Sequence, residues 1–393
     1  GYVHVPASRV TNDAHSYRLP VVQLASGPGA TNGAMIYLSG GPGSSAINQP
    51  YVFRAFTNTV RVIAMNQRGT YLSQPGLFPI SDEETTEELQ VRLGGPGGMD
   101  FNTINTRENA ADVHDVMTVL GNPTFNVWGT SYGTMLSQEV IRQHPERIRA
   151  AVLDGVVKLD EPQWTVMAQG FYDAVIAMTN DVGRDADANR WYPDFGGMLM
   201  DFAAELYPDD YSDFFSSVFH QMNLSRWGRV EDVPGVVWRA ARGELAAIAG
   251  LSAINPPVEN PPPDGPMSGN MYAMMIRHDM LPFESMTNAA ALLDTIPFPL
   301  NEHGYAYSQD QYDGSEDWDF ITPVDASFRT AVTNDVPVLV LNGSYDTQTP
   351  PRGARHVATN LPHAYYVELP YIGHVVLFGG DVPAQIGCDF FAN

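Results

Sequence analysis

The chain has 393 residues, of which 44% are hydrophobic and 17% charged, and its formal net charge at pH 7 is −24. This negative charge argues against nucleic acid and anionic membrane surfaces as partners, because both would repel the protein. No apolar stretch approaches the roughly 18–20 residues that cross a bilayer, and the single cysteine, Cys388, excludes an intrachain disulfide.

Three apolar segments in the first part of the chain, residues 16–25, 34–39 and 60–65, are predicted to be strands. The second and third each end in a turn-rich motif, Gly40-Gly41-Pro42-Gly43 and Asn66-Gln67-Arg68-Gly69. Residues 71–101 are predicted to form a long, solvated loop, because they carry a patch of acidic residues: Asp82, Glu83, Glu84, Glu87 and Glu88.

Helix and strand patterns alternate from residue 105 to residue 157. Asn105 or Thr106 could cap a helix, and its apolar residues at i, i+3, i+4 and i+7 would share one face: Val113, Val116, Met117 and Leu120. A strand at 125–130, a helix at 134–144 and a strand at 148–157 are predicted next. Such alternation indicates an α/β fold with a mostly parallel, doubly wound sheet.

The junction between the 125–130 strand and the following helix reads Gly129-Thr130-Ser131-Tyr132-Gly133. This G-x-S-x-G pattern is typical of the sharp elbow that presents a catalytic serine. The turn strains the serine backbone and leaves no room for side chains two residues before and after the serine. Gly129 and Gly133 meet this requirement because they have no side chain. Ser131 would also lie at a helix N-terminus, where N–H groups favour developing negative charge. Ser131 is therefore the predicted nucleophile.

Between about residues 159 and 324 amphipathic helical patterns, for example at 166–178 and 236–249, replace the apolar strands. A proline-rich connector at 255–266 and an acidic, turn-rich stretch at 310–319 interrupt them. Strand patterns return at 336–341 and 364–369, and a helix is predicted from Val382. The length suits one large domain with an insertion, or two domains. We expect a core at 1–158 and 325–393, interrupted by a helical cap at 159–324.

A serine hydroxyl is a poor nucleophile until a base removes its proton, so the chain must supply a histidine and an orienting acid. Asp346 follows the 336–341 strand and His374 follows the 364–369 strand. Both therefore come at carboxyl ends of strands, the edge where the elbow serine is expected. Asp154 also follows a strand and is a second candidate for the acid. His363 precedes its strand, which places it at the wrong edge.

The oxyanion formed on attack requires N–H donors, and the predicted ones are the backbone groups of Tyr132 and Gly41. The loop from Gly41 to Ala46 also fits a dinucleotide-binding pattern, G-x-G-x-x-A. That site would require an acidic residue about 20 positions later, where Asn66 and Arg68 stand instead. No metal-ligand spacing occurs, so neither a cofactor nor a metal is expected.

Several of these motifs together resemble signature blocks of the prolyl iminopeptidase and tripeptidyl aminopeptidase family of α/β-hydrolases. They are the Gly40–Gly43 and Asn66–Gly69 motifs, Asn105-Thr106, the elbow, and Leu153-Asp154-Gly155-Val156. The run from Val336 to His374 is similar to the tripeptidyl aminopeptidase branch. The resemblance covers residues 1–158 and 325–393 and only weakly the cap. It implies Ser131 as nucleophile, Asp346 as acid, His374 as base, and exopeptidase action at a free N-terminus.

The chain departs from the family pattern at three points, of which the first two leave the triad intact. Ser39 stands where the family usually has histidine, and Asn66 replaces the usual aspartate. Cysteines that often link the cap of secreted relatives are missing, and residues 271–283, where the resemblance implies one, contain none. Because the cap selects the substrate, these cap differences leave its identity open.

The sequence therefore predicts a serine hydrolase that forms an acyl-enzyme, with three readings of its function. The first is an aminopeptidase that releases short N-terminal pieces from peptides. The second is an esterase or lactonase acting on a hydrophobic small molecule, and the third is a non-catalytic binding protein on the same fold. A complete triad disfavours the third. The expected partner is a small peptide or ester, without nucleic acid or membrane insertion.

Cap residues favour different substrates. A free ammonium would require carboxylates, and the candidates are Glu161, Glu205, Glu231, Glu244 and Glu284. Methionines favour a broad apolar pocket or simple packing: Met271, Met274, Met275, Met280 and Met286. The chain begins at Gly1 without methionine, as after removal of a signal peptide or trimming, and a periplasmic or secreted location is slightly favoured over a cytoplasmic one.

Overall fold

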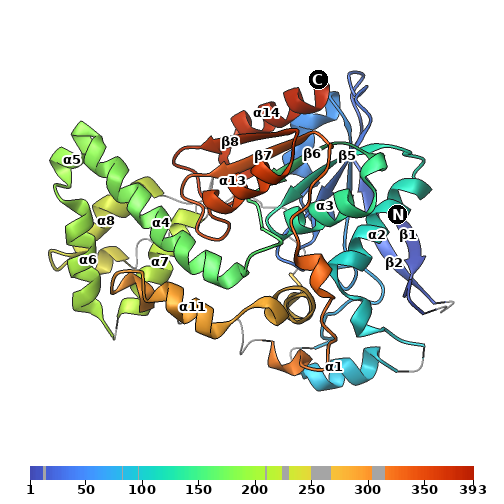
Figure 1. The fold of residues 1–393 in the computed structure, drawn as a ribbon, viewed down its shortest axis with the longest axis horizontal. Helices are drawn as coiled ribbons and strands as arrows, with labels where there is room; N and C mark the ends of the chain where they lie inside the picture. Colours follow the sequence, from blue (N-terminus) through green and yellow to red (C-terminus); the bar gives the residue numbers. More distant parts are fainter. Residues whose placement is uncertain are drawn as a thin grey trace.

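The computed structural model describes residues 1–11, 15–81, 83–95, 97–208, 210–223, 230–248, 267–302 and 315–393. They form an eight-stranded sheet of order β1-β2-β4-β3-β5-β6-β7-β8 (Figure 1). The strands are β1 Tyr2–Pro6, β2 Ser16–Gln23, β3 Ala34–Leu38, β4 Arg61–Met65, β5 Phe125–Thr130, β6 Ile148–Asp154, β7 Val338–Gly343 and β8 Ala364–Leu369. Only the β1–β2 and β2–β4 pairs are antiparallel. The mostly parallel sheet confirms the predicted α/β fold class.

The central strands are buried on both faces, which explains their continuous apolar sequences. In β3, Ile36 and Leu38 belong to one apolar cluster, whereas Met35 and Tyr37 belong to another. Successive side chains of a strand point to opposite faces of the sheet. Each face must therefore be covered, as is usual for parallel sheets.

Helices cover both faces of the sheet. The first cluster includes side chains of α2 Thr106–Val119, α3 Tyr132–Gln143 and α13 Pro351–Asn360. The second includes side chains of the 3₁₀ segment η2 Pro50–Asn58 and of α14 Asp381–Ala392. Asn105, one of the two cap candidates in the sequence, caps α2 by accepting the Glu108 backbone N–H at 2.9 Å.

The chain between β6 and β7 is mainly helical in its described part. Its helices are α4 Gln163–Arg184, α5 Ala186–Trp191, α6 Phe195–Leu206, α7 Tyr211–Asn223, α8 Val233–Ala240, α10 Gly269–Met275 and α11 Met286–Leu293. Helices α4 to α8 lie to one side of the sheet (Figure 1), and they share a separate apolar cluster that includes Phe171, Phe202 and Phe215. The helix predicted at 166–178 lies within α4.

Other expectations for this region are only partly covered by the described residues. Helix α8 ends at Ala240, well before the predicted end at residue 249, which lies outside the described residues. The proline-rich connector at 255–266 and the first half of the acidic stretch at 310–319 also lie outside them. Among the described residues, none of the helices combines the length and the apolarity that crossing a bilayer requires.

The prediction of a continuous loop at 71–101 is wrong, because helix α1 Thr86–Leu93 lies within it. Thr85 accepts the N–H of Glu88, and the Glu88 side chain accepts the N–H of Thr85, which is a capping box. Leu89 is buried on the inner side of this helix. Asp82 of the predicted acidic patch lies outside the described residues. Strand β1 was not predicted, and it forms the edge of the sheet beside β2.

The Asn66–Gly69 motif holds the N-terminal segment against the core. Arg68 is completely buried, and its guanidinium contacts both carboxylate oxygens of Asp112, at 2.5 and 2.8 Å. The same group donates to the backbone oxygens of Pro6 and Ala7, each at 2.7 Å. A buried charge must be paired in this way, so the contacts of Arg68 indicate a structural role.

Candidate active site

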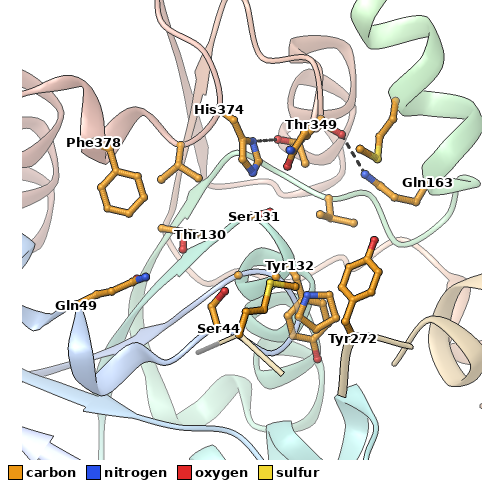
Figure 2. Close-up of a pocket in the computed structure, with 18 of the residues that line it drawn as sticks. Ser44, Gln49, Thr130, Ser131, Tyr132, Gln163, Tyr272, Thr349, His374 and Phe378 are labelled. Atoms are coloured by element: carbon orange, nitrogen blue, oxygen red, sulfur yellow. Dashed lines mark hydrogen bonds between the residues drawn. The ribbon is translucent and has the colours of Figure 1, made fainter. Parts of the chain in front are cut away.

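A cavity of about 430 Å³ lies where the carboxyl ends of several strands meet. Ser131, Thr349 and His374 line it together (Figure 2). Much of the remaining wall is apolar or aromatic: Val157, Met167, Met267, Tyr272, Met280, Val375 and Phe378. This edge of a parallel sheet is the usual place for a ligand site, so the predicted serine and histidine are brought to one cavity.

Ser131 occupies a strained turn between β5 and α3. Its φ is 54° and its ψ is −124°, a region that non-glycine residues rarely adopt. A Cβ at Gly129 would lie 2.3 Å from the backbone oxygen of Gly133, and one at Gly133 would lie 2.0 Å from that of Leu38. Both positions therefore require glycine, as the elbow pattern predicted.

His374 and Asp346 are in direct contact. The Nδ1 atom of His374 lies 2.9 Å from Oδ2 and 3.1 Å from Oδ1 of Asp346. The side chain of Asp346 has no exposed surface, and that of His374 is 11% exposed. Two loops that follow β7 and β8 thus place an acid against the ring nitrogen of a histidine that faces the cavity.

The orientation of Asp346 is fixed by further hydrogen-bond donors whose role was not predicted from the sequence. The backbone N–H groups of Gln348 and Thr349 donate to Oδ1, at 3.0 and 2.8 Å. The Thr349 hydroxyl donates to Oδ2 at 2.7 Å and lies 3.1 Å from Nδ1 of His374. The Asp-Thr-Gln-Thr sequence is a local signal for such a turn, because an aspartate often accepts N–H groups two and three residues later.

The electrostatic surroundings of His374 favour its protonated form. Burial lowers the pKa of the imidazole, but the negative charge of Asp346 and the hydrogen bond to it outweigh burial. The charge of Asp154 adds to this effect, and the net result is a pKa raised above the ordinary value for histidine. An imidazolium formed in this position is therefore stabilised by the protein.

The two competing residues lie elsewhere. The carboxylate oxygens of Asp154 accept the backbone N–H groups of Val376 and Leu377, at 2.8 and 2.9 Å. Burial raises the pKa of Asp154 to about 7. The side chain of His363 is 61% exposed and directly precedes β8, at the opposite end of that strand from His374.

The two residues predicted to bind the oxyanion, Gly41 and Tyr132, both line the cavity. Tyr132 is the first residue of α3, where backbone N–H groups are not used within the helix. Gly41 has a φ of +107°, and a Cβ there would lie 2.9 Å from the backbone nitrogen of Gly43. The loop is held by Ser39, whose hydroxyl donates to the Ser44 backbone oxygen at 2.8 Å. Asn66 supports it further by accepting the N–H of Ile47 at 3.1 Å.

The five candidate carboxylates for an ammonium group are absent from the described wall of this cavity. Glu161 pairs with Lys158 and Glu244 with Arg239, each at 2.8 Å. Glu205 lines a different cavity, and Glu231 lies in a short 3₁₀ segment. Glu284 accepts the backbone N–H of Gln163, which does line the cavity. Glu284 therefore contacts a residue of the cavity wall but does not line the cavity itself.

The predicted methionines divide between two roles. Met271, Met274 and Met275 are completely buried in the main apolar cluster, whereas Met280 also lines the cavity. Met167 and Met267 line it as well, although the sequence did not single them out. Across the described ranges, no group of three or more His, Cys, Asp or Glu side chains is arranged to hold a metal ion.

Comparison with known proteins gives one family and several distant relatives. The family model for the alpha/beta hydrolase fold matches residues 33–381. The putative hydrolase YuaR of Escherichia coli is 26% identical over 183 residues, which cover 41% of this chain and 36% of that protein. The proline iminopeptidase of Neisseria meningitidis is 31% identical over 134 residues, or 34% of this chain and 35% of that protein.

Two further matches are a serine protease and a second proline iminopeptidase. The serine protease Hip1 of Mycobacterium tuberculosis is 25% identical over 185 residues, or 39% of this chain and 36% of that protein. The solved structure of proline iminopeptidase from Mycobacterium smegmatis is 16% identical, with a TM-score of 0.47 and coverage of 100% of this chain and 97% of that chain. The alignments with these curated relatives span 35–36% of the relatives' own length.

Proposed function

Because this chain belongs to the alpha/beta hydrolase fold family, we propose that it is a serine hydrolase with Ser131 as nucleophile, His374 as base and Asp346 as orienting acid. One observation carries the proposal. The cavity that contains Ser131 on its strained elbow also contains His374, whose far ring nitrogen is held by a buried carboxylate. A non-catalytic binding protein would not require this combination.

In the proposed reaction His374 removes the proton of the Ser131 hydroxyl as its oxygen attacks a substrate carbonyl carbon. The negative charge that develops on the carbonyl oxygen is stabilised by the backbone N–H groups of Tyr132 and Gly41. His374 then donates the proton to the leaving group, which leaves an acyl-enzyme. A water molecule, activated by His374 in the same way, releases the acid and restores Ser131.

Asp346 acts through His374 and does not contact the substrate. Its carboxylate holds Nδ1 of the ring, so the other nitrogen, Nε2, is directed to the serine proton. It also stabilises the imidazolium that forms during each attack. This carboxylate is held in place by the backbone N–H groups of Gln348 and Thr349 and by the Thr349 hydroxyl.

We also propose that residues 159–324 form a cap over a core made of residues 1–158 and 325–393. Two observations support this division: the helices between β6 and β7 have their own apolar cluster, and the described part of the region contributes five residues to the wall of the cavity. These residues are Gln163, Met167, Met267, Tyr272 and Met280. In this arrangement the cap selects the substrate and the core performs the chemistry.

For the substrate we propose a peptide with a free N-terminus, in line with the relatives named proline iminopeptidase and serine protease. An ester or lactone with an apolar acyl group is the second candidate. It is favoured by the methionines and aromatic residues of the wall and by the positions of the five glutamates. The described part of the wall carries no carboxylate that could pair with an ammonium group.

A panel of three chromogenic substrates separates these candidates. It consists of a short peptide arylamide with a free N-terminus, its N-acetylated twin, and an aryl ester of the same acyl group. An aminopeptidase would prefer the free amine in kcat/KM by a factor of ten or more, equivalent to about 1.4 kcal/mol. Equal rates for the two amides, or turnover of the ester alone, would favour the esterase. No turnover of any of the three would count against the hydrolase itself.

A further inference from the structure

Asp154 contacts the loops of both the proposed nucleophile and the proposed base. It is the last residue of β6 and is completely buried. Its backbone oxygen accepts the N–H of Ser131 at 2.9 Å. Its two carboxylate oxygens accept the N–H groups of Val376 and Leu377, at 2.8 and 2.9 Å. One residue therefore fixes the elbow through its main chain and the segment after His374 through its side chain.

The segment that Asp154 holds has a backbone that needs support. Val375, directly after His374, has a φ of 62° and a ψ of 91°, which is costly for a β-branched residue. The 3₁₀ segment η10 Val376–Gly379 begins immediately afterwards without a side-chain cap of its own. The carboxylate of Asp154 caps this segment instead, because it accepts the N–H groups of the first two residues of the segment.

The residue after Asp154 packs against the imidazole itself. Gly155 has a φ of +68°, and a Cβ at this position would lie 3.1 Å from Cε1 and 3.2 Å from Nδ1 of His374. The end of β6 thus supports one side of the ring, while Asp346 holds its Nδ1 atom. A shift of this strand end would move the ring relative to Ser131.

We propose that Asp154 is a positioning residue that holds His374 at the correct place and angle relative to Ser131, an inference that rests on the proposed serine hydrolase function. Asp154 does not serve as the acid of the triad, because both of its oxygens are engaged by backbone N–H groups and His374 turns Nδ1 to Asp346. It does not line the cavity, so its action on the reaction passes through His374.

The charge of Asp154 gives this role a signature that a purely structural residue would lack. Burial raises the pKa of Asp154, the two backbone N–H groups and His374 lower it, and Asp346 raises it, with a resulting value of about 7. His374 and Asp346 are the charged groups that face it. The negative charge in turn raises the pKa of His374. Asp154 is partly protonated near pH 7, so it titrates together with His374. Removal of its ionisable carboxyl group should lower the apparent pKa of His374 and move the acid limb of the activity profile to lower pH.

The test is the variant Asp154→Asn, assayed from pH 5 to 9 with the best substrate of the panel. We expect kcat to fall by about 10- to 100-fold, the range for small misplacements of a catalytic group, with KM unchanged. We also expect the acid limb to move to lower pH. Wild-type kcat together with a wild-type acid limb would overturn the proposal.

Asp279→Asn is the matched control. Asp279 is also completely buried, and burial raises its pKa to about 7, but it accepts from Thr106 instead of the His374 loop. Its variant should leave the acid limb in place; an equal shift in both variants would overturn the proposal.

If Asp154→Asn does not fold, Asp154→Ser provides the same test, since its hydroxyl can still accept one N–H. Fluorophosphonate labelling of the wild type checks the hydrolase separately: without labelling at Ser131 the proposed function fails, whereas labelling with unaltered Asp154 variants refutes only this inference.

Discussion

The Nδ1 atom of His374 lies 2.9 Å from Oδ2 of Asp346, and the side chain of Asp346 has no exposed surface. The two residues are 28 positions apart in sequence, and they meet because β7 and β8 are parallel neighbours whose following loops emerge at the same edge. The histidine lines the same cavity as Ser131. This relationship is the basis of the first prediction.

Replacement of Asp346 by asparagine should lower kcat by about 10⁴-fold, because the amide leaves the imidazole in the wrong tautomer. The size of the side chain is unchanged, so the fold should be retained, as circular dichroism can verify. Asp154→Asn should cost much less, since its carboxylate contacts backbone N–H groups rather than the ring. If Asp154→Asn were the more damaging of the two, the roles of these aspartates would have to be exchanged.

Activity should decline as pH falls through the pKa of His374, because only the neutral imidazole can accept the serine proton. The ordinary pKa of histidine is about 6.5, and Asp346 and Asp154 raise that of His374 despite its burial. The acid limb of kcat/KM should therefore lie above pH 6.5. A profile that stays flat down to pH 5 would show that no histidine with a raised pKa takes part.

Gly40→Ala should impair catalysis more than folding. A Cβ at Gly40 would lie 2.7 Å from Cβ and 3.3 Å from Oγ of Ser131, so the serine must move, and small displacements can cost about 100-fold in rate. The control is Gly183→Ala in α4, where a Cβ meets no atom within 4 Å. This second variant should keep full activity and gain up to about 1 kcal/mol of stability. Equal activities of the two variants would contradict the prediction.

Arg68→Met should destabilise the protein by about 3–5 kcal/mol, because it leaves buried Asp112 without its main partner. Urea unfolding measures this difference directly. The variant should retain the wild-type KM, since Arg68 does not line the cavity. A loss of activity without a loss of stability would assign Arg68 a role at the site that its contacts do not suggest.

Much of this architecture follows from short-range patterns in the sequence. The elbow was predictable because positions 129 and 133 have room only for glycine. The strands of the core were predictable because burial on both faces requires continuous apolar runs. Helix α1 was missed because its polar composition concealed the capping box at Thr85 and Glu88, a pattern that was present in the sequence.

Contacts between distant segments could not be predicted in the same way. Asp154 ends one strand and Asp346 follows another, so the sequence alone could not show that one accepts backbone N–H groups and the other holds the histidine ring. The role of Thr349 follows only from the structure, in which its hydroxyl contacts both Asp346 and His374. The wall of the cavity combines residues near the strand ends with Gln163, Met167, Met267, Tyr272 and Met280, and such a combination depends on tertiary packing.

The most direct test of the account is the site of covalent labelling by a fluorophosphonate probe, identified by mass spectrometry of the digested protein. We expect one adduct, on the peptide that contains Ser131, with loss of activity in proportion to labelling. Ser131→Ala should fold normally, remain unlabelled and lose about 10⁶-fold in kcat, as when a triad serine is removed. An adduct on another serine, or substantial activity in Ser131→Ala, would contradict the assignment of the nucleophile.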